Sequence, residues 1–240
     1  MILTGGNPCL KSIVSSINSF DKAKETSMTI IDDHSSEETI SRMKEVTLTC
    51  NGKVEFIHLE GTGNNDSLKK TYELAMGKGA SLIYFVEDDH IHKETAIQYM
   101  VNAFENFSKK LPNGQVAIAP YDDPIDYISE IIPARIVASK DCHWRQNFHT
   151  TCTVLLTKWV LLHFWDKFTA LSNYGINGIN EDNTINLIYR SEEVFLFTPI
   201  PFQAFHLQDV PPVVGEYTSL LEANLDKIPH GDLTSQGDGV

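Results

Sequence analysis

The sequence is poor in basic residues. Its 240 residues include 19 lysines and arginines against 32 aspartates and glutamates, which gives a formal net charge of −13. A protein that binds nucleic acid presents a basic surface to the phosphates, so this balance argues against a nucleic-acid partner. The same excess of acid disfavours an anionic membrane surface as partner. A phosphate compound would need a metal ion to mediate its binding, because the field of the protein repels it.

Several other patterns are missing as well. The four cysteines form no CxxC pair and no spacing typical of zinc sites, so we expect free thiols in a reducing compartment. No phosphate-binding glycine loop is present, and the N-terminus lacks a basic segment followed by an apolar one. The longest apolar stretch, 154–165, is broken by Lys158 and His163 and is too short to span a bilayer. We therefore expect a cytoplasmic protein without an integral membrane segment.

What the sequence does contain is an alternation of strand and helix patterns. Apolar stretches typical of buried strands occur at 28–31, 54–59, 81–86, 115–119, 153–156 and 194–197, with a short candidate at 1–4. Helical spacing or helix-start signals occur at 10–20, from 35, at 66–76, 96–104, 159–168 and 182–190. This order predicts an α/β fold with a mainly parallel central sheet flanked by helices. We expect one domain over residues 1–210 and a partly flexible C-terminal extension over 211–240.

Acidic residues follow two of the predicted strands. Glu87-Asp88-Asp89-His90 comes directly after the strand at 81–86, and the tripeptide Asp-Asp-His occurs both at 88–90 and at 32–34. Carboxylates this close repel one another and need a cation or a shared proton to sit together. Parallel strands end at the same edge of a sheet, so both clusters could lie on one functional rim. An acidic turn that merely starts the next helix is the alternative.

Three further groups carry polar chemistry. Glu181-Asp182 opens a predicted helix, where acids are favourable whether or not they are catalytic. Trp144 and Arg145 could stack on a sugar or base and hold a phosphate, or they could simply pack at the edge of the core. His206 follows an apolar stretch, where a lone histidine is more often structural than a ligand.

Taken in order, the first of these segments resembles the GT-A glycosyltransferases of family 2. The stretch 29–36 is similar to the family sequence "VVDDGSTD", with His34 where glycine is common. The stretch 61–75 resembles the loop and helix that follow in that family. The acidic triplet 87–89 resembles the DxD motif, with Glu87 in place of the usual first aspartate.

The later segments extend this resemblance to roughly residues 1–206. Glu181-Asp182 followed by Arg190 resembles the "ED" segment of the family, whose aspartate deprotonates the acceptor hydroxyl in inverting enzymes. His206 is placed where many such enzymes carry a late metal-ligating histidine.

The resemblance implies a single GT-A (Rossmann-like) domain and a metal-dependent glycosyltransferase of the hexosyltransferase type. Such an enzyme moves a sugar from a nucleoside-diphosphate donor, with a UDP-sugar favoured, to a glycan or other hydroxyl acceptor, and a single displacement inverts the anomeric centre. The implied cofactor is Mn²⁺ or Mg²⁺. The implied roles are metal binding by Asp89, Glu87 and His206, catalysis by Asp182 as base with Glu181, and donor binding by Thr4, Asp33, Asp66, Asp88, Trp144 and Arg145.

Two other functions remain open from the sequence. A metal-dependent phosphohydrolase or nucleotidyltransferase could use the same acids with His90 and His92 to hold its metal. A non-catalytic nucleotide-sugar or carbohydrate-binding module would keep its ligand after loss of Asp182 and would turn over no acceptor. Phosphate release from nucleotides without a sugar acceptor would favour the first of these alternatives.

Overall fold

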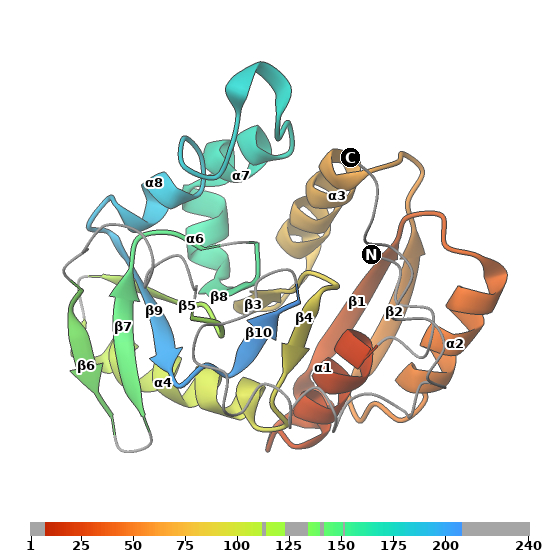
Figure 1. Cartoon of the computed structure of the whole chain (residues 1–240), viewed down its shortest axis with the longest axis horizontal. Helices are drawn as coiled ribbons and strands as arrows, with labels where there is room; N and C mark the ends of the chain where they lie inside the picture. The colour runs from red at the N-terminus through yellow and green to blue at the C-terminus, as the bar shows by residue number, and fades with distance from the viewer. Residues whose placement is uncertain (1–7, 112–113, 123–133, 140–141, 151, 208–240) are drawn as a thin grey trace, which may run out of the picture.

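The computed structural model describes residues 8–111, 114–122, 134–139, 142–150 and 152–207 (Figure 1). Helices and strands alternate through the first half in the order α1 Pro8–Asn18, η1 Ala23–Glu25, β1 Ser27–Asp32, α2 Glu37–Thr47, β2 Lys53–His58, α3 Asn64–Gly77, β3 Leu82–Phe85, β4 His90–His92, α4 Ala96–Lys110 and β5 Gln115–Ile118. The second half contains β6 Ile136–Ala138, β7 His143–Asn147, β8 Val154–Thr157, α6 Lys158–His163, α7 Trp165–Leu171, η2 Ile176–Gly178, α8 Asn186–Tyr189, β9 Val194–Ile200 and β10 Ala204–His206. The strand expected at 1–4 and the extension expected at 211–240 lie outside the described residues.

The strands of the described chain form one six-stranded sheet and two strand pairs. The large sheet has the order β3-β8-β5-β9-β7-β6, and among the pairs of neighbouring strands in it only β5–β9 is parallel. β1 and β2 form a parallel pair, whereas β4 and β10 pair in antiparallel fashion. The expected α/β domain is confirmed, but its large sheet is mixed. An apolar stretch predicts a strand without its direction, and β7 and β8 enter the sheet antiparallel to their neighbours.

Helices cover both faces of the large sheet, as the alternation of core residues along single strands makes clear. In β5, Val116 and Ile118 pack with α1 and α4, while Ala117 packs with α3, α6, α7 and α8. In β8, Leu155 faces the first group of helices and Leu156 the second. Successive strand residues point to opposite faces, so two apolar cores form on one sheet. Figure 1 shows α4 along one side of the sheet and α6 and α7 on the other.

Two predicted helices differ from those observed. The helix expected at 159–168 is divided into α6 and α7 at Phe164, whose backbone leaves helical geometry. The helix expected at 182–190 is present only as the short α8. The sequence pattern also gave no sign of β4, β6, β7 and β10, because these strands have three to five residues and several are rich in polar side chains. Among the helices of the described residues, none has the length and apolar character needed to cross a membrane.

Candidate functional site

Asp89 lies between two histidines at the junction of β4 and β10. Its Oδ1 is 2.9 Å from Nδ1 of His90, and its Oδ2 is 2.7 Å from Nε2 of His206. The antiparallel pairing of the strands sets His206 opposite His90, and the two imidazole rings stack with centroids 4.7 Å apart. The prediction had placed Asp89 and His206 in one site although 117 positions separate them, and the structure brings them together.

This group has the composition of a divalent-metal site. One ligand atom each from Asp89, His90 and His206 lies within 4.8 Å of the others. The Nε2 atom of His90 is fully buried and has no hydrogen-bond partner within the described part of the chain. One carboxylate oxygen and two imidazole nitrogens suit a cation such as Mn²⁺, so the residues fit the expected cofactor. Burial opposes ionisation of Asp89, but the hydrogen bonds from His206 and His90 outweigh it and lower the pKa of this carboxyl.

The other two acids of the triplet are placed differently. The Glu87 carboxylate is not part of the Asp89 group: its Oε2 is 3.3 Å from Oγ1 of Thr153, and its backbone N–H donates to the same hydroxyl. Thr153 Oγ1 also lies 3.3 Å from Nδ1 of His90 and so connects Glu87 to the metal-competent group. Asp88 is exposed in the turn between the strands.

The Asp33 carboxylate is exposed where β1 ends, and a tight loop holds it there. It accepts a hydrogen bond from the N–H of Gly63 at 2.8 Å, and Nδ1 of His34 lies 3.0 Å from its other oxygen. His34 has a φ of 59°, the left-handed region that favours glycine, which is the residue the related motif carries. The hydrogen bonds from His34 and then from Gly63 lower the pKa of Asp33. Its neighbour Asp32 is buried beside His58, at 3.1 Å.

Asp66 stabilises the same loop from inside α3. Its carboxylate accepts from the N–H of Thr62 at 2.9 Å, three residues into a helix that begins at Asn64. The helix expected at 66–76 therefore begins two residues earlier, at Asn64. Any side chain at Gly61 would collide with this carboxylate, since an added Cβ would lie 2.1 Å from Oδ2 of Asp66. A contact between Asp66 and a donor stays a prediction.

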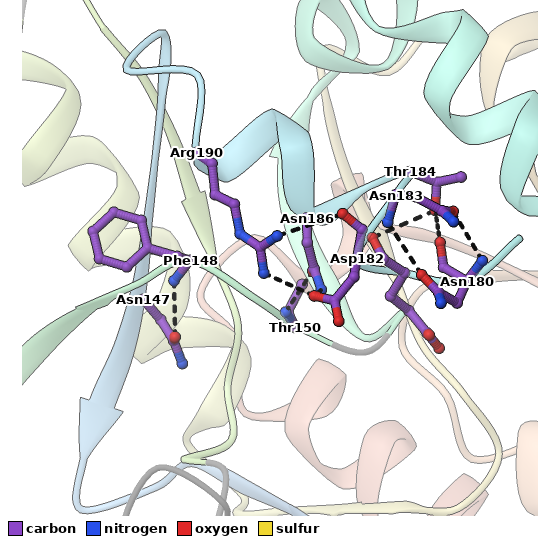
Figure 2. A network of polar contacts seen from close by, with 10 residues as sticks. Asn147, Phe148, Thr150, Asn180, Asp182, Asn183, Thr184, Asn186 and Arg190 are labelled. Atoms are coloured by element: carbon purple, nitrogen blue, oxygen red, sulfur yellow. Dashed lines mark hydrogen bonds and ion pairs between the residues drawn. The ribbon is translucent and has the colours of Figure 1, made fainter. Parts of the chain in front are cut away.

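Glu181 and Asp182 lie in a turn just before α8, and Figure 2 shows the contacts of Asp182. The carboxylate of Asp182 accepts from Nη2 of Arg190 at 2.7 Å and from Nδ2 of Asn186 at 3.2 Å. The hydrogen bond from Arg190, then that from Asn186, lowers the pKa of Asp182. Asn180 and Asn183 exchange backbone-to-side-chain hydrogen bonds across the turn, which fixes the two acids between them.

The pKa of the Cys152 thiol is affected by one acid from each of the two segments, Glu87 and Glu181. Burial, then the Glu87 carboxylate and, less strongly, the Glu181 carboxylate raise the pKa of Cys152. Both acids are therefore within electrostatic range of one sulfur atom.

Trp144 and Arg145 are placed in the interior. The Trp144 indole is 2% exposed, donates to Ser139 Oγ at 3.2 Å and packs edge-on against Phe107 in the core. The Arg145 guanidinium forms a buried ion pair with Asp122. Since the indole has no exposed face for a ligand, the structure favours the alternative of packing at the core edge over a donor contact for Trp144.

Two site residues were missing from the predicted set. His90 was named as a metal ligand only for the phosphohydrolase or nucleotidyltransferase alternative, although it directly follows Asp89, and Asn186 was not singled out at all. Adjacency to the acidic triplet could have indicated His90. Asn186 follows Asp182 by four residues, a spacing that brings two side chains together on a helix, whereas its contact with Thr150 depends on tertiary folding. Thr4 lies outside the described residues.

The fold is also found in solved structures of low sequence identity. The crystal structure of S. aureus TarS residues 1–349 aligns with a TM-score of 0.50 and 13% identity, over 81% of this chain and 58% of that chain. The complex of S. aureus TarS residues 1–349 with UDP aligns equally well, over 81% of this chain and 57% of that chain. This chain therefore spans well under two thirds of the TarS chains, and at such identity the likeness shows a shared fold.

Sequence comparison gives the family. No curated protein matches the chain. The pattern of glycosyl transferase family 2 matches residues 7–172, which is more than half of the 240 residues and includes the β1 acids, the α3 loop and the acidic triplet. With its GT-A-type α/β fold and its strand-end acids, the chain belongs to glycosyl transferase family 2.

Proposed function

We propose that this chain transfers a sugar from a nucleoside-diphosphate donor to a hydroxyl acceptor, with UDP as the favoured nucleotide and inversion at the anomeric carbon. The observation that carries the proposal is the group Asp89, His90 and His206, a metal-competent donor set that includes the last acid of the triplet 87–89, in a chain of glycosyl transferase family 2. The UDP complex of TarS supports UDP as the nucleotide because the two folds are alike.

In this proposal, one set of residues binds the sugar donor and its metal ion, and another acts on the acceptor. Asp89, His90 and His206 would hold Mn²⁺ or Mg²⁺. When bound, such a cation stabilises the negative charge that develops on the departing diphosphate. Asp33 is exposed and fixed by Gly63 at the end of β1, where it can accept a hydrogen bond from the donor's base.

Asp182 is our candidate for the general base. As the acceptor hydroxyl attacks the anomeric carbon, its proton passes to the Asp182 carboxylate and the bond to the diphosphate breaks. Arg190 and Asn186 keep this carboxylate ionised, as its lowered pKa indicates. A carboxylate with a low pKa is a weak base, so its contribution depends on exact placement against the acceptor.

Thermal unfolding with a panel of nucleotides tests the donor and metal assignments. UDP, GDP, CMP and ATP would each be added with and without Mn²⁺. A ligand at ~100 times its Kd stabilises the native state by about 2.7 kcal/mol, which is a rise of several degrees in Tm. We expect the largest rise with UDP and Mn²⁺ together, and we expect Asp89→Ala to abolish the part that requires Mn²⁺.

The matched control is Asp166→Ala, which removes an exposed acid paired with Lys167 on α7. It should behave like the wild type with every ligand. Equal Tm values with and without each nucleoside diphosphate would contradict the proposal. Release of inorganic phosphate from UDP or ATP in the absence of an acceptor would instead favour a phosphohydrolase.

A further inference from the structure

The Asp182 carboxylate is held through only one of its two oxygens. Oδ1 accepts from Nη2 of Arg190 at 2.7 Å and from Nδ2 of Asn186 at 3.2 Å (Figure 2). Arg190 also donates from Nη1 to the main-chain oxygen of Asp182 at 3.4 Å, which fixes the backbone of the same residue. Within the described part of the chain, Oδ2 has no hydrogen-bond partner. Two donors on one oxygen orient the carboxylate and leave its other oxygen available.

Asn186 is the more rigid of the two donors. It is 4% exposed, and its Oδ1 accepts from the backbone N–H of Thr150 at 3.2 Å. This second bond fixes which end of the amide faces Asp182, because the oxygen is already used on the Thr150 side. Asn186 also begins α8, whose Ile188 and Tyr189 are packed in the core. The amide therefore joins the segment after β7 to the acidic turn.

We propose that Asn186 is a positioning residue for Asp182, holding the carboxylate by Oδ1 so that Oδ2 is the atom that takes the acceptor's proton. This inference rests on the proposed role of Asp182 as general base. The acceptor O–H bond breaks, its hydrogen goes to Oδ2, and its oxygen forms the new bond to the anomeric carbon while the diphosphate oxygen leaves with the electron pair.

Arg190 alone would not give this orientation. Its side chain is long and 44% exposed, so it has several rotamers from which to reach the carboxylate. The short, buried side chain of Asn186 has little such freedom. Arg190 provides most of the stabilisation of the negative charge on Asp182, and Asn186 fixes the orientation of its carboxylate.

The charges around Asp182 set the sign of the pH effect. Arg190 and His149 favour its ionised form, as does the Asn186 donor, and Glu181 is the neighbouring acid. Removing the Asn186 donor raises the pKa of Asp182, because one hydrogen bond to the charged form is lost. The base works only when ionised, so the acid limb of the rate profile moves to higher pH.

Two substitutions distinguish the two hydrogen bonds of the Asn186 side chain, the one with Thr150 and the one with Asp182. Asn186→Leu removes both of them, whereas Asn186→Asp keeps the acceptor for Thr150 and replaces the donor by a carboxylate. The carboxyl carbon of Asp182 would be titrated by ¹³C NMR in the free protein. In parallel, UDP release from UDP-glucose and UDP-N-acetylglucosamine would be followed with Mn²⁺ and with water as acceptor.

For both variants we expect a higher pKa of Asp182, a kcat lower by about tenfold and an unchanged KM for the donor. Ser191→Ala is the control, since it removes a hydrogen bond to Ile188 at the other end of α8 without touching Asp182. It should leave the Asp182 titration and the pH profile as in the wild type. If Asn186→Leu does not fold, Asn186→Asp carries the test.

Failure of the inference and failure of the proposed function give different results. A wild type that turns over, together with Asn186 variants whose kcat and Asp182 titration are unchanged, overturns the positioning role alone. A wild type that releases no UDP from either sugar overturns the proposed function and the inference with it.

Discussion

Among the carboxylates with a lowered pKa, Asp89 and Asp182 have different hydrogen-bond partners. Asp89 is one-quarter exposed and is stabilised by the imidazoles of His90 and His206. Asp182 is 70% exposed and is stabilised by the guanidinium of Arg190 and the amide of Asn186. The first group lies where two short strands pair, and the second lies in a turn before a short helix.

Because their hydrogen-bond partners differ, the two carboxylates are suited to different chemical roles. An imidazole can lose its proton and offer a nitrogen lone pair to a metal, so the partners of Asp89 can become ligands beside it. A guanidinium stays charged and has no lone pair to offer, so Arg190 repels cations from Asp182 and keeps it ionised. One carboxylate is therefore suited to metal binding and the other to accepting a proton.

The largest expected effect is that of Asp182→Asn on sugar transfer. An amide cannot take the acceptor's proton, and general-base groups contribute roughly 10²–10⁴-fold to rates, so kcat should fall by about 10³-fold. Binding of UDP with Mn²⁺ should stay as in the wild type, because the Asp89 group is unchanged. Steady-state kinetics and calorimetric UDP binding measure the two quantities.

Asp166→Asn is the control for the loss of an exposed negative charge. Its kcat should equal that of the wild type. Normal turnover in Asp182→Asn would remove the functional distinction between the two carboxylates and exclude Asp182 as the base.

His90→Ala should show how much the Asp89 group contributes to the stability of the fold. The His90 imidazole is fully buried, stacks on His206 and contacts Tyr121 edge-on. Its removal leaves a cavity and a carboxylate with one donor fewer, for which we expect a loss of about 2–3 kcal/mol in urea unfolding. Stabilisation by Mn²⁺ should disappear as well. A variant that keeps its full response to Mn²⁺ would show that His90 is not a ligand.

Much of the fold could be predicted from the sequence because its signals are local. The apolar stretches that became β1, β2, β3, β5, β8 and β9 have strong strand character, and each strand begins and ends within three residues of its predicted position. Strand direction and the short strands β4 and β10 could not be predicted, since both depend on long-range pairing. The pair β4–β10 alone determines that His206 lies opposite His90.

The site was predictable only where its residues adjoin a strand or a motif. Asp89 and Asp33 directly follow apolar strands, and the family resemblance led to His206 and Asp182. The sequence left two interpretations open for Trp144, a binding surface or core packing, because burial, here 2% exposure, is decided by tertiary packing. Asn186 was not singled out because its contact with Thr150 joins residues 36 positions apart and exists only in the folded chain.

The smallest expected effect is that of Arg190→Gln on stability. The Arg190–Asp182 pair is exposed, and exposed ion pairs contribute about 0–1 kcal/mol, so we expect a loss near 0.5 kcal/mol that shrinks further at high salt. Arg42→Gln, which removes the exposed pair with Glu38 on α2, should cost a similar amount and serves as the control in urea unfolding. The kcat of Arg190→Gln should nevertheless fall by more than that of Arg42→Gln, because the Asp182 carboxylate loses one of the two hydrogen bonds that hold its Oδ1 in place. A loss of stability as large as that of His90→Ala would mean that the Asp182 group holds the fold together as the Asp89 group does.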